Sequence, residues 1–185
     1  MFRRMRKPEN HRSEYATCND FKQIFTEDMA GLHLLVFLLT SVQDKAEQCF
    51  VAGLDDSIKG NRVFRQWARS WSKRAIIKPA IRMIRPASTD PRLVISDGLT
   101  LAQMNAMLIS SVTALAPFQR FVFAMAVLEG YSTTECALLL GCTVKEVVAA
   151  RVEASREVSL RRNGHFLEPS RPITWREFLP ADNAA

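Results

Sequence analysis

Apolar residues recur along most of this chain at intervals of three and four positions, the spacing that places side chains on one face of a helix. The pattern predicts an amphipathic helix over residues 21–39 and a second helix over residues 44–54. A third helical pattern runs over about residues 62–84, with Trp67 and Trp71 in its apolar seam, so both indoles are expected in the core. An indole that is exposed could instead stack on an unpaired base.

Breaks in this pattern divide the chain. Pro79 predicts a kink or a break within the third segment. Turn-forming residues gather over residues 86–98, and three or four further helices are expected from there to about Arg162. The segment 164–185 contains three prolines and is expected to be irregular, although its Trp175 and Phe178 could dock a short helical turn onto a domain.

The sequence therefore predicts an all-α fold of two small helical domains joined by a linker, the second containing a helix-turn-helix. The expected parts are a basic N-terminal tail over 1–18, a first domain over 19–86, a linker over 87–100, a second domain over 101–163 and a C-terminal tail over 164–185.

Composition narrows this picture. The 185 residues are 48% hydrophobic and 24% charged, which is typical of a folded protein, and the 7 glycines and 8 prolines are too few for a turn-rich β architecture. The net charge of +6 is unevenly spread, because residues 61–86 carry eight basic side chains and no acidic one. Such a basic block favours a polyanionic partner, whereas the acidic segment before it suits a basic protein surface.

Several function classes find no support in the sequence. The basic N-terminus has no apolar segment of a signal peptide, and the longest apolar run, 31–39, is too short to span a bilayer. The 4 cysteines and 3 histidines show no zinc-ligand spacing and no catalytic constellation. We therefore expect a reduced, cytoplasmic protein that is not an enzyme and has no cofactor, no metal and no membrane partner.

Residues 132–147 carry the most informative motif. A helix-turn-helix needs a small residue where its helices cross, a tight turn four residues later and an aliphatic residue six beyond that. Ala137, Gly141 and Val147 meet these requirements, and Gly141 can adopt the left-handed conformation that ends the first helix.

Capping residues frame the same motif. Ser132 with Glu135 and Thr143 with Glu146 have the spacing of capping boxes at the starts of the two helices. A helical hairpin without DNA-binding function would share these features, and it remains the alternative interpretation of the motif.

The region around this motif resembles region four of bacterial RNA polymerase sigma factors. Among these factors, the small extracytoplasmic-function type is the closest to this chain in length. The resemblance covers about residues 101–160. It rests on Leu-Ala-Pro-Phe-Gln-Arg at 115–120, Leu-Glu-Gly-Tyr-Ser at 128–132, Glu-Cys-Ala-Leu-Leu-Leu-Gly at 135–141 and the helix ending Ala-Ser-Arg at 154–156.

The first half is similar to region two of the same family. Asp-Lys-Ala-Glu at 44–47 is similar to the stretch that docks on the polymerase clamp, and Phe-Arg-Gln-Trp at 64–67 matches the family's Phe-Arg-x-Trp. The resemblance implies core RNA polymerase and promoter DNA as partners, together with a regulatory protein such as an anti-sigma factor.

On these grounds Asp44 and Glu47 are the expected polymerase contacts, and Lys145 is the expected base reader in the major groove. Phosphate contacts are expected from two rows of basic residues in the first half and from arginines in the second. The residues assigned to DNA are Arg65, Arg69, Lys73, Arg74, Lys78, Arg82, Arg120, Thr143, Lys145, Arg151 and Arg156.

Departures from the family pattern keep two alternatives open. Gln48, Val51 and Ala52 replace clamp-docking residues, and Val148, Ala150 and Glu153 occupy recognition-helix positions that are usually basic or polar. One alternative is a protein-interaction or self-associating module that no longer reads promoters. Its two halves pack together, or the chain self-associates, through Val144, Val148 and Val152. The other is a DNA-binding regulator that acts without polymerase.

Overall fold

The computed structural model describes residues 14–60, 62–89 and 104–162, and this part of the chain is helical, which confirms the all-α fold class. The predicted linker from residue 90 and the C-terminal tail lie outside the described residues, as does the N-terminal tail to residue 13. We call the described residues up to 89 the N-terminal half and residues 104–162 the C-terminal half.

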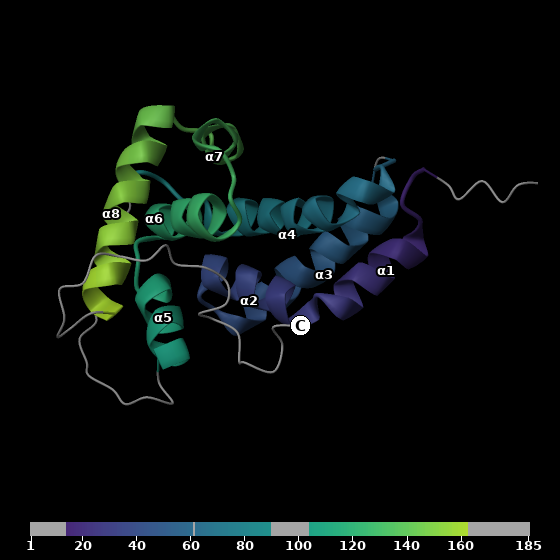
Figure 1. The fold of residues 1–185 in the computed structure, drawn as a ribbon, viewed down its shortest axis with the longest axis horizontal. Coiled ribbons are helices and arrows are strands. Elements are labelled where there is room, and N and C mark those ends of the chain that lie inside the picture. The colour runs from purple at the N-terminus through teal and green to yellow at the C-terminus, as the bar shows by residue number, and fades with distance from the viewer. Residues whose placement is uncertain (1–13, 61, 90–103, 163–185) are drawn as a thin grey trace, which may run out of the picture.

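The N-terminal half contains four α-helices and one short 3₁₀ turn (Figure 1). In chain order they are α1 (Cys18–Glu27), α2 (Met29–Thr40), α3 (Gln43–Lys59), the 3₁₀ turn η1 (Arg65–Trp67) and α4 (Ala68–Ile84). The long helices α3 and α4 lie side by side, and α1 and α2 pack against them.

The C-terminal half follows as α5 (Met104–Thr113), α6 (Pro117–Val122), the π-helical segment η3 (Phe123–Leu128), α7 (Thr133–Leu140) and α8 (Val144–Arg162). Figure 1 shows this half at one end of the α3–α4 pair, with α5 beside α2.

One predicted helix is divided in the structure. The segment predicted as one helix over 21–39 is broken at Asp28, which ends α1 and precedes α2. Of the kink or break predicted at Pro79, the break is absent, since α4 continues through this residue to Ile84. Residue 79 is buried in this helix, so packing against the core offsets the backbone hydrogen bond that proline cannot donate.

The two halves share one hydrophobic core. Leu35, Leu39 and Ile76 of the N-terminal half belong to the same buried cluster as Phe121 and Val147 of the C-terminal half. A second cluster also crosses the boundary, because Leu38 packs with side chains of α5, η3 and α8. In this structure the halves are packed together, but not through Val144, Val148 and Val152 as the interaction-module alternative expected, because these three valines are exposed.

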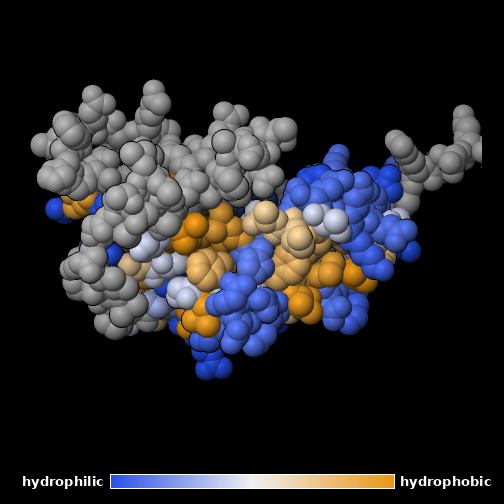
Figure 2. Space-filling model, turned by 90° about the horizontal axis from the view of Figure 1, so that it is seen from below, coloured by the Kyte–Doolittle hydropathy of each residue, from blue (hydrophilic) through white to orange (hydrophobic). Residues whose placement is uncertain are grey.

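Part of α2 remains at the surface. Figure 2 shows apolar side chains gathered across the face seen from below. Met29, Leu34 and Phe37 line a shallow groove of about 410 Å³ together with His33 and Gln43.

Within the described residues, no helix combines the length and the apolar character that crossing a bilayer requires.

Candidate nucleic-acid interface

Helices α7 and α8 form the helix pair expected from the motif. Gly141 has a φ of 67°, in the left-handed region, and its N–H closes the last turn of α7 on the carbonyl of Ala137. Val147 is fully buried, and Ala137 is buried beside it in the same cluster. The turn and its two core positions are therefore confirmed, whereas its role in reading DNA stays a prediction.

Both predicted capping boxes are confirmed. The Ser132 and Glu135 side chains each accept a hydrogen bond from the other's backbone N–H, at 3.2 and 2.9 Å. Thr143 and Glu146 do the same at 3.2 and 2.8 Å. Thr143, assigned to DNA from the sequence, thus contributes its hydroxyl to the start of α8.

The basic residues of α8 do not converge on one face. Lys145, Arg151 and Arg156 are all exposed. At about 100° per residue, Lys145 and Arg156 lie on one side of the helix and Arg151 lies well away from them. Val148 and Val152, which are 46% and 65% exposed, occupy the surface between these basic residues. A helix that reads the major groove needs several polar or basic side chains on one outward face, and α8 presents few.

Two acidic residues of α8 accept hydrogen bonds from other parts of the chain. Glu146 accepts hydrogen bonds from Thr143 and from the hydroxyl of Ser88 in the N-terminal half, at 2.6 Å for the latter. These hydrogen bonds, that from Ser88 first, lower the pKa of Glu146 to about 2. Glu153 accepts a hydrogen bond of 2.9 Å from Gln119 of α6.

Arg120 does not lie at the surface, so its assignment to DNA is corrected. Only 3% of the residue is exposed. Its Nε donates to the carbonyl of Leu39 at 3.1 Å, and its Nη1 donates to the carbonyls of Thr113 and Leu115 at 3.0 and 3.4 Å. The guanidinium therefore joins the end of α2 to the turn between α5 and α6, where the helix dipoles favour a cation.

The basic rows of the N-terminal half are at the surface, but many members are paired. Arg65 binds Asp20 at 3.0 Å, and Arg69 binds both Glu27 and Asp28. These carboxylates, that of Asp28 first, raise the pKa of Arg69. Ion pairs at the surface contribute little to stability.

The other basic residues lie along α4. Lys73 forms an ion pair of 2.8 Å with Glu129 of the C-terminal half, and only 3% of the Glu129 side chain is exposed. Lys78 lies over the ring of Trp71 at 5.2 Å, and Arg82 is 3.7 Å from Asp56. Arg74 faces Tyr131 and Glu135 across a cleft.

The aromatic residues near η1 form an exposed cluster that the sequence did not predict. Trp67 is 57% exposed and meets the edge of Phe64, with ring centroids 5.2 Å apart. Tyr15 stacks on Phe64 at 4.8 Å, and the guanidinium of Arg62 lies 5.7 Å from the centre of the Tyr15 ring. Hydrogen bonds from Ala16 to Val63 and from Arg65 to the carbonyl of Glu14 hold the two segments together.

Trp67 escapes the core because it precedes α4. The seam that groups Trp67 with Trp71 assumes a continuous helix, but α4 begins at Ala68. Trp71 is half-buried beside the cluster of Phe21, Ile24 and Ala68. Its position is therefore closer to the predicted place in the core than that of Trp67. Its indole N–H is buried without an acceptor among the described residues.

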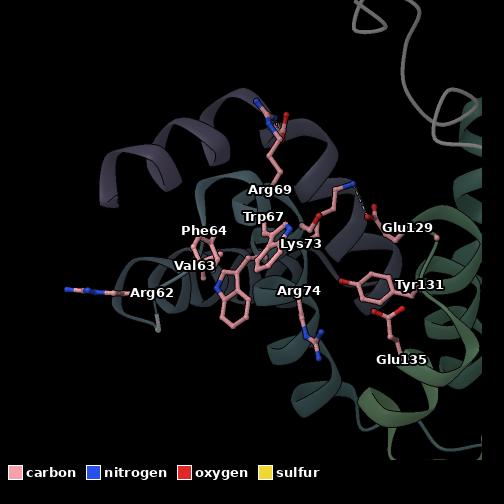
Figure 3. A pocket seen from close by; sticks show the side chains of 14 residues that line it. Arg62, Val63, Phe64, Trp67, Arg69, Lys73, Arg74, Glu129, Tyr131 and Glu135 are labelled. Carbon is pink, nitrogen blue, oxygen red and sulfur yellow. Dashed lines mark hydrogen bonds and ion pairs between the residues drawn. The ribbon is translucent and has the colours of Figure 1, made fainter. Parts of the chain in front are cut away.

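A cleft of about 690 Å³ separates the two halves at this point (Figure 3). Phe64, Trp67, Lys73 and Arg74 lie on the N-terminal side, and Glu129, Tyr131 and Glu135 lie on the other. Burial, and to a lesser degree the charge of Glu129, raises the pKa of Tyr131 to about 12, so its hydroxyl is a hydrogen-bond donor at neutral pH. The cleft combines cations, aromatic faces and hydrogen-bonding groups.

The predicted polymerase contacts lie on a different surface. Asp44 is in the first turn of α3 and Glu47 is one turn further on, and both are exposed. Glu47 accepts a hydrogen bond of 2.9 Å from Gln43, which lines the apolar groove on α2. This acidic surface therefore adjoins an apolar one.

Among the described residues, no group of histidine, cysteine and acidic side chains could hold a metal ion. Cys49 and Cys136 are free and fully buried, and burial raises the pKa of the Cys136 thiol to about 11, so Cys136 packs as a small apolar residue.

No protein-family model matches the chain, and no curated protein is significantly similar to it.

Proposed function

We propose that this chain is a sigma-factor-like transcription protein that binds core RNA polymerase and promoter DNA. The observation that supports it best is the exposed Trp67 with Phe64 and Tyr15, bordered by Arg62 and Arg65. Aromatic faces beside mobile cations are the chemistry that binds unpaired bases and their phosphates.

In this proposal Trp67 stacks on an unpaired base and the arginines neutralise the flanking phosphates. Arg65 and Arg69 exchange their carboxylate partners for phosphate oxygens, which costs little because the pairs are exposed. Lys145, Arg151 and Arg156 of α8 add phosphate contacts on duplex DNA rather than a readout of several bases. Asp44 and Glu47 dock on a basic surface of the polymerase.

Single-stranded DNA binding tests the aromatic cluster. Trp67→Ala should weaken binding of a fluorescently labelled oligonucleotide by about 1–3 kcal/mol, the usual value of one stacked base. Arg65→Ala should weaken it and also reduce the dependence of affinity on salt concentration. Lys59→Ala is the matched control, because it removes a cation from an exposed ion pair with Asp55 on α3. Equal binding by wild type and Trp67→Ala would contradict the site.

Polymerase binding tests the initiation role separately. The full chain should co-elute with core RNA polymerase in gel filtration and support run-off transcription. Failure to bind core removes the initiation role, and salt-sensitive DNA affinity without core binding identifies a regulator that acts alone.

A second candidate function is a protein-interaction module that no longer reads promoters. The exposed Val144, Val148 and Val152 on the helix that should read DNA favour it, as do the packed halves. Native pull-down distinguishes the two candidates, because this module recovers a protein partner without polymerase or DNA.

A further inference from the structure

The outward side of α8 carries an apolar stripe that has no packing partner among the described residues. Val144, Val148 and Val152 are 44%, 46% and 65% exposed and follow one another at a spacing of four. Ser155 and Ser159 continue the same line. We call this surface the valine face. It lies beside the buried side of α8, and its residues 144, 148, 152, 155 and 159 are all uncharged.

The valine face is poorly suited to a second copy of the chain. A stable dimer usually buries about 800 Å² on each partner, and three half-exposed valines supply much less. Basic residues also border both sides of the stripe, with Arg151 on one and Lys145 and Arg156 on the other. In a two-fold pair of these helices, each basic border would meet another basic border.

The chain itself supplies a better occupant. Asn163 and Gly164 follow directly after α8, and Asn-Gly is a sequence that favours a reversal of the chain. Pro169 and Pro172 then favour an extended run, and Trp175, Phe178 and Leu179 follow at helical spacing. A short amphipathic turn of this kind binds to an apolar helix face through its three anchors.

The length of the connecting segment fits the distance. Val148 lies 14 residues before Arg162, about 21 Å along the axis of α8. The 12 residues from 163 to 174 can extend over roughly 40 Å, so a reversed chain reaches the valine face with residues to spare. Tethering gives the segment an effective concentration in the millimolar range. Residues 163–185 carry three acids and two bases, and the acids suit the basic borders.

We propose that residues 174–179 pack against the valine face of α8, with Trp175, Phe178 and Leu179 over Val144, Val148 and Val152. The outward side of the helix that the motif assigns to DNA is then occupied by the chain's own segment. This inference does not depend on the proposed function.

Trp175 provides a direct test in the full chain. In a Trp67→Phe/Trp71→Phe background Trp175 is the single tryptophan, since the sequence has 3. Val148→Asp should shift its emission to longer wavelength and raise acrylamide quenching severalfold. Ala149→Asp is the matched control, because residue 149 is exposed on another side of α8 and should leave both signals unchanged. Val152→Asp repeats the test at the most exposed valine.

Limited trypsin digestion gives a second measurement with all three tryptophans in place. Cleavage after Arg176 should be slow in the wild type and in Ala149→Asp, and faster in Val148→Asp and Val152→Asp. Circular dichroism should show that each variant keeps its helical content.

Three outcomes would overturn the proposal. If acrylamide fully quenches Trp175 in the Trp67→Phe/Trp71→Phe protein that keeps Val148, the segment does not bind the valine face. A molecular mass that rises with concentration in wild type but not in Val148→Asp shows that a second copy occupies the face. Loss of DNA binding in Val148→Asp with unchanged Trp175 emission shows that DNA occupies the face.

Discussion

Single side chains that resemble functional residues in the sequence turn out to hold the two halves together. Arg120 lies at a position where the sigma-factor pattern has an arginine, yet its guanidinium donates to three backbone carbonyls inside the molecule. Burying an arginine requires such partners, because an unpaired buried charge is costly. The sequence shows that a base is present but cannot show which carbonyls the fold brings to it.

Glu146 combines two structural tasks. It caps α8 through Thr143 and reaches Ser88, which belongs to the N-terminal half. The capping box could be predicted from the spacing of Thr143 and Glu146, whereas the contact with Ser88 depends on a fold that brings together residues 58 positions apart.

We predict that this carboxylate makes stability depend on acid. The folded pKa of Glu146 is about 2, below its ordinary value of 4.5, so the unfolded chain binds more protons between these values. Its stabilising contribution is present above about pH 4.5 and is lost as the pH falls towards 2. Glu146→Gln should therefore flatten the decline of unfolding free energy across this interval, measured by denaturant titration at several pH values.

At the scale of elements, the close approach of α3 and α4 depends on a single glycine. A Cβ atom at Gly53 would lie 2.3 Å from Cγ2 of Ile76 and 2.9 Å from its backbone. Ile76 is fully buried in the shared core, so the neighbour has no space into which to move.

Gly53→Ala should therefore destabilise the protein by about 1–3 kcal/mol, the usual cost of overpacking a core. Gly31→Ala is the matched control, because no atom would lie within 4 Å of its Cβ and alanine favours a helix. It should stabilise the protein by about 0.5–1 kcal/mol. Thermal unfolding followed by circular dichroism measures both changes, and a neutral Gly53→Ala would show that the helices can separate at no cost.

Helix positions were predictable where a local signal fixes them and were not where the fold decides. The capping residues and Gly141 gave the boundaries of α7 and the start of α8 correctly. The break at Asp28 was missed because apolar spacing continues across it, and it is Arg69 of a distant segment that binds this carboxylate. Trp67 was placed in the core because periodicity alone does not reveal that α4 begins one residue later.

At the scale of the whole molecule, composition and periodicity predicted an all-α chain but not how its halves sit. Both halves are rich in apolar helices, and sequence patterns cannot distinguish a surface that packs within one half from one that packs between halves. The candidate site was predicted in part for the same reason. The basic block was evident, while the cleft beside it needs Glu129, Tyr131 and Glu135 from the other half.

The shared core also bears on how the proposed function would operate. Lys73 is paired with Glu129, whose side chain is buried between the halves. Separating the halves would leave that carboxylate without its partner and would expose the apolar side chains of the common cluster. DNA and polymerase should therefore bind the packed form, through Trp67 on one surface and Asp44 on another, without a preceding separation.

Cooperative unfolding tests this view. Phe121 of α6 is fully buried in the cluster that Leu35, Leu39 and Ile76 share. Phe121→Ala should cost about 3–5 kcal/mol. If the halves unfold as one unit, amide hydrogen exchange in α3 and α4 should accelerate as much as exchange in α8. The substitution itself lies in α6, outside all three helices. Leu160→Ala, at an exposed position of α8, should leave exchange unchanged in both halves. Acceleration confined to the C-terminal half would instead identify two independent domains, whose separation could then precede promoter binding.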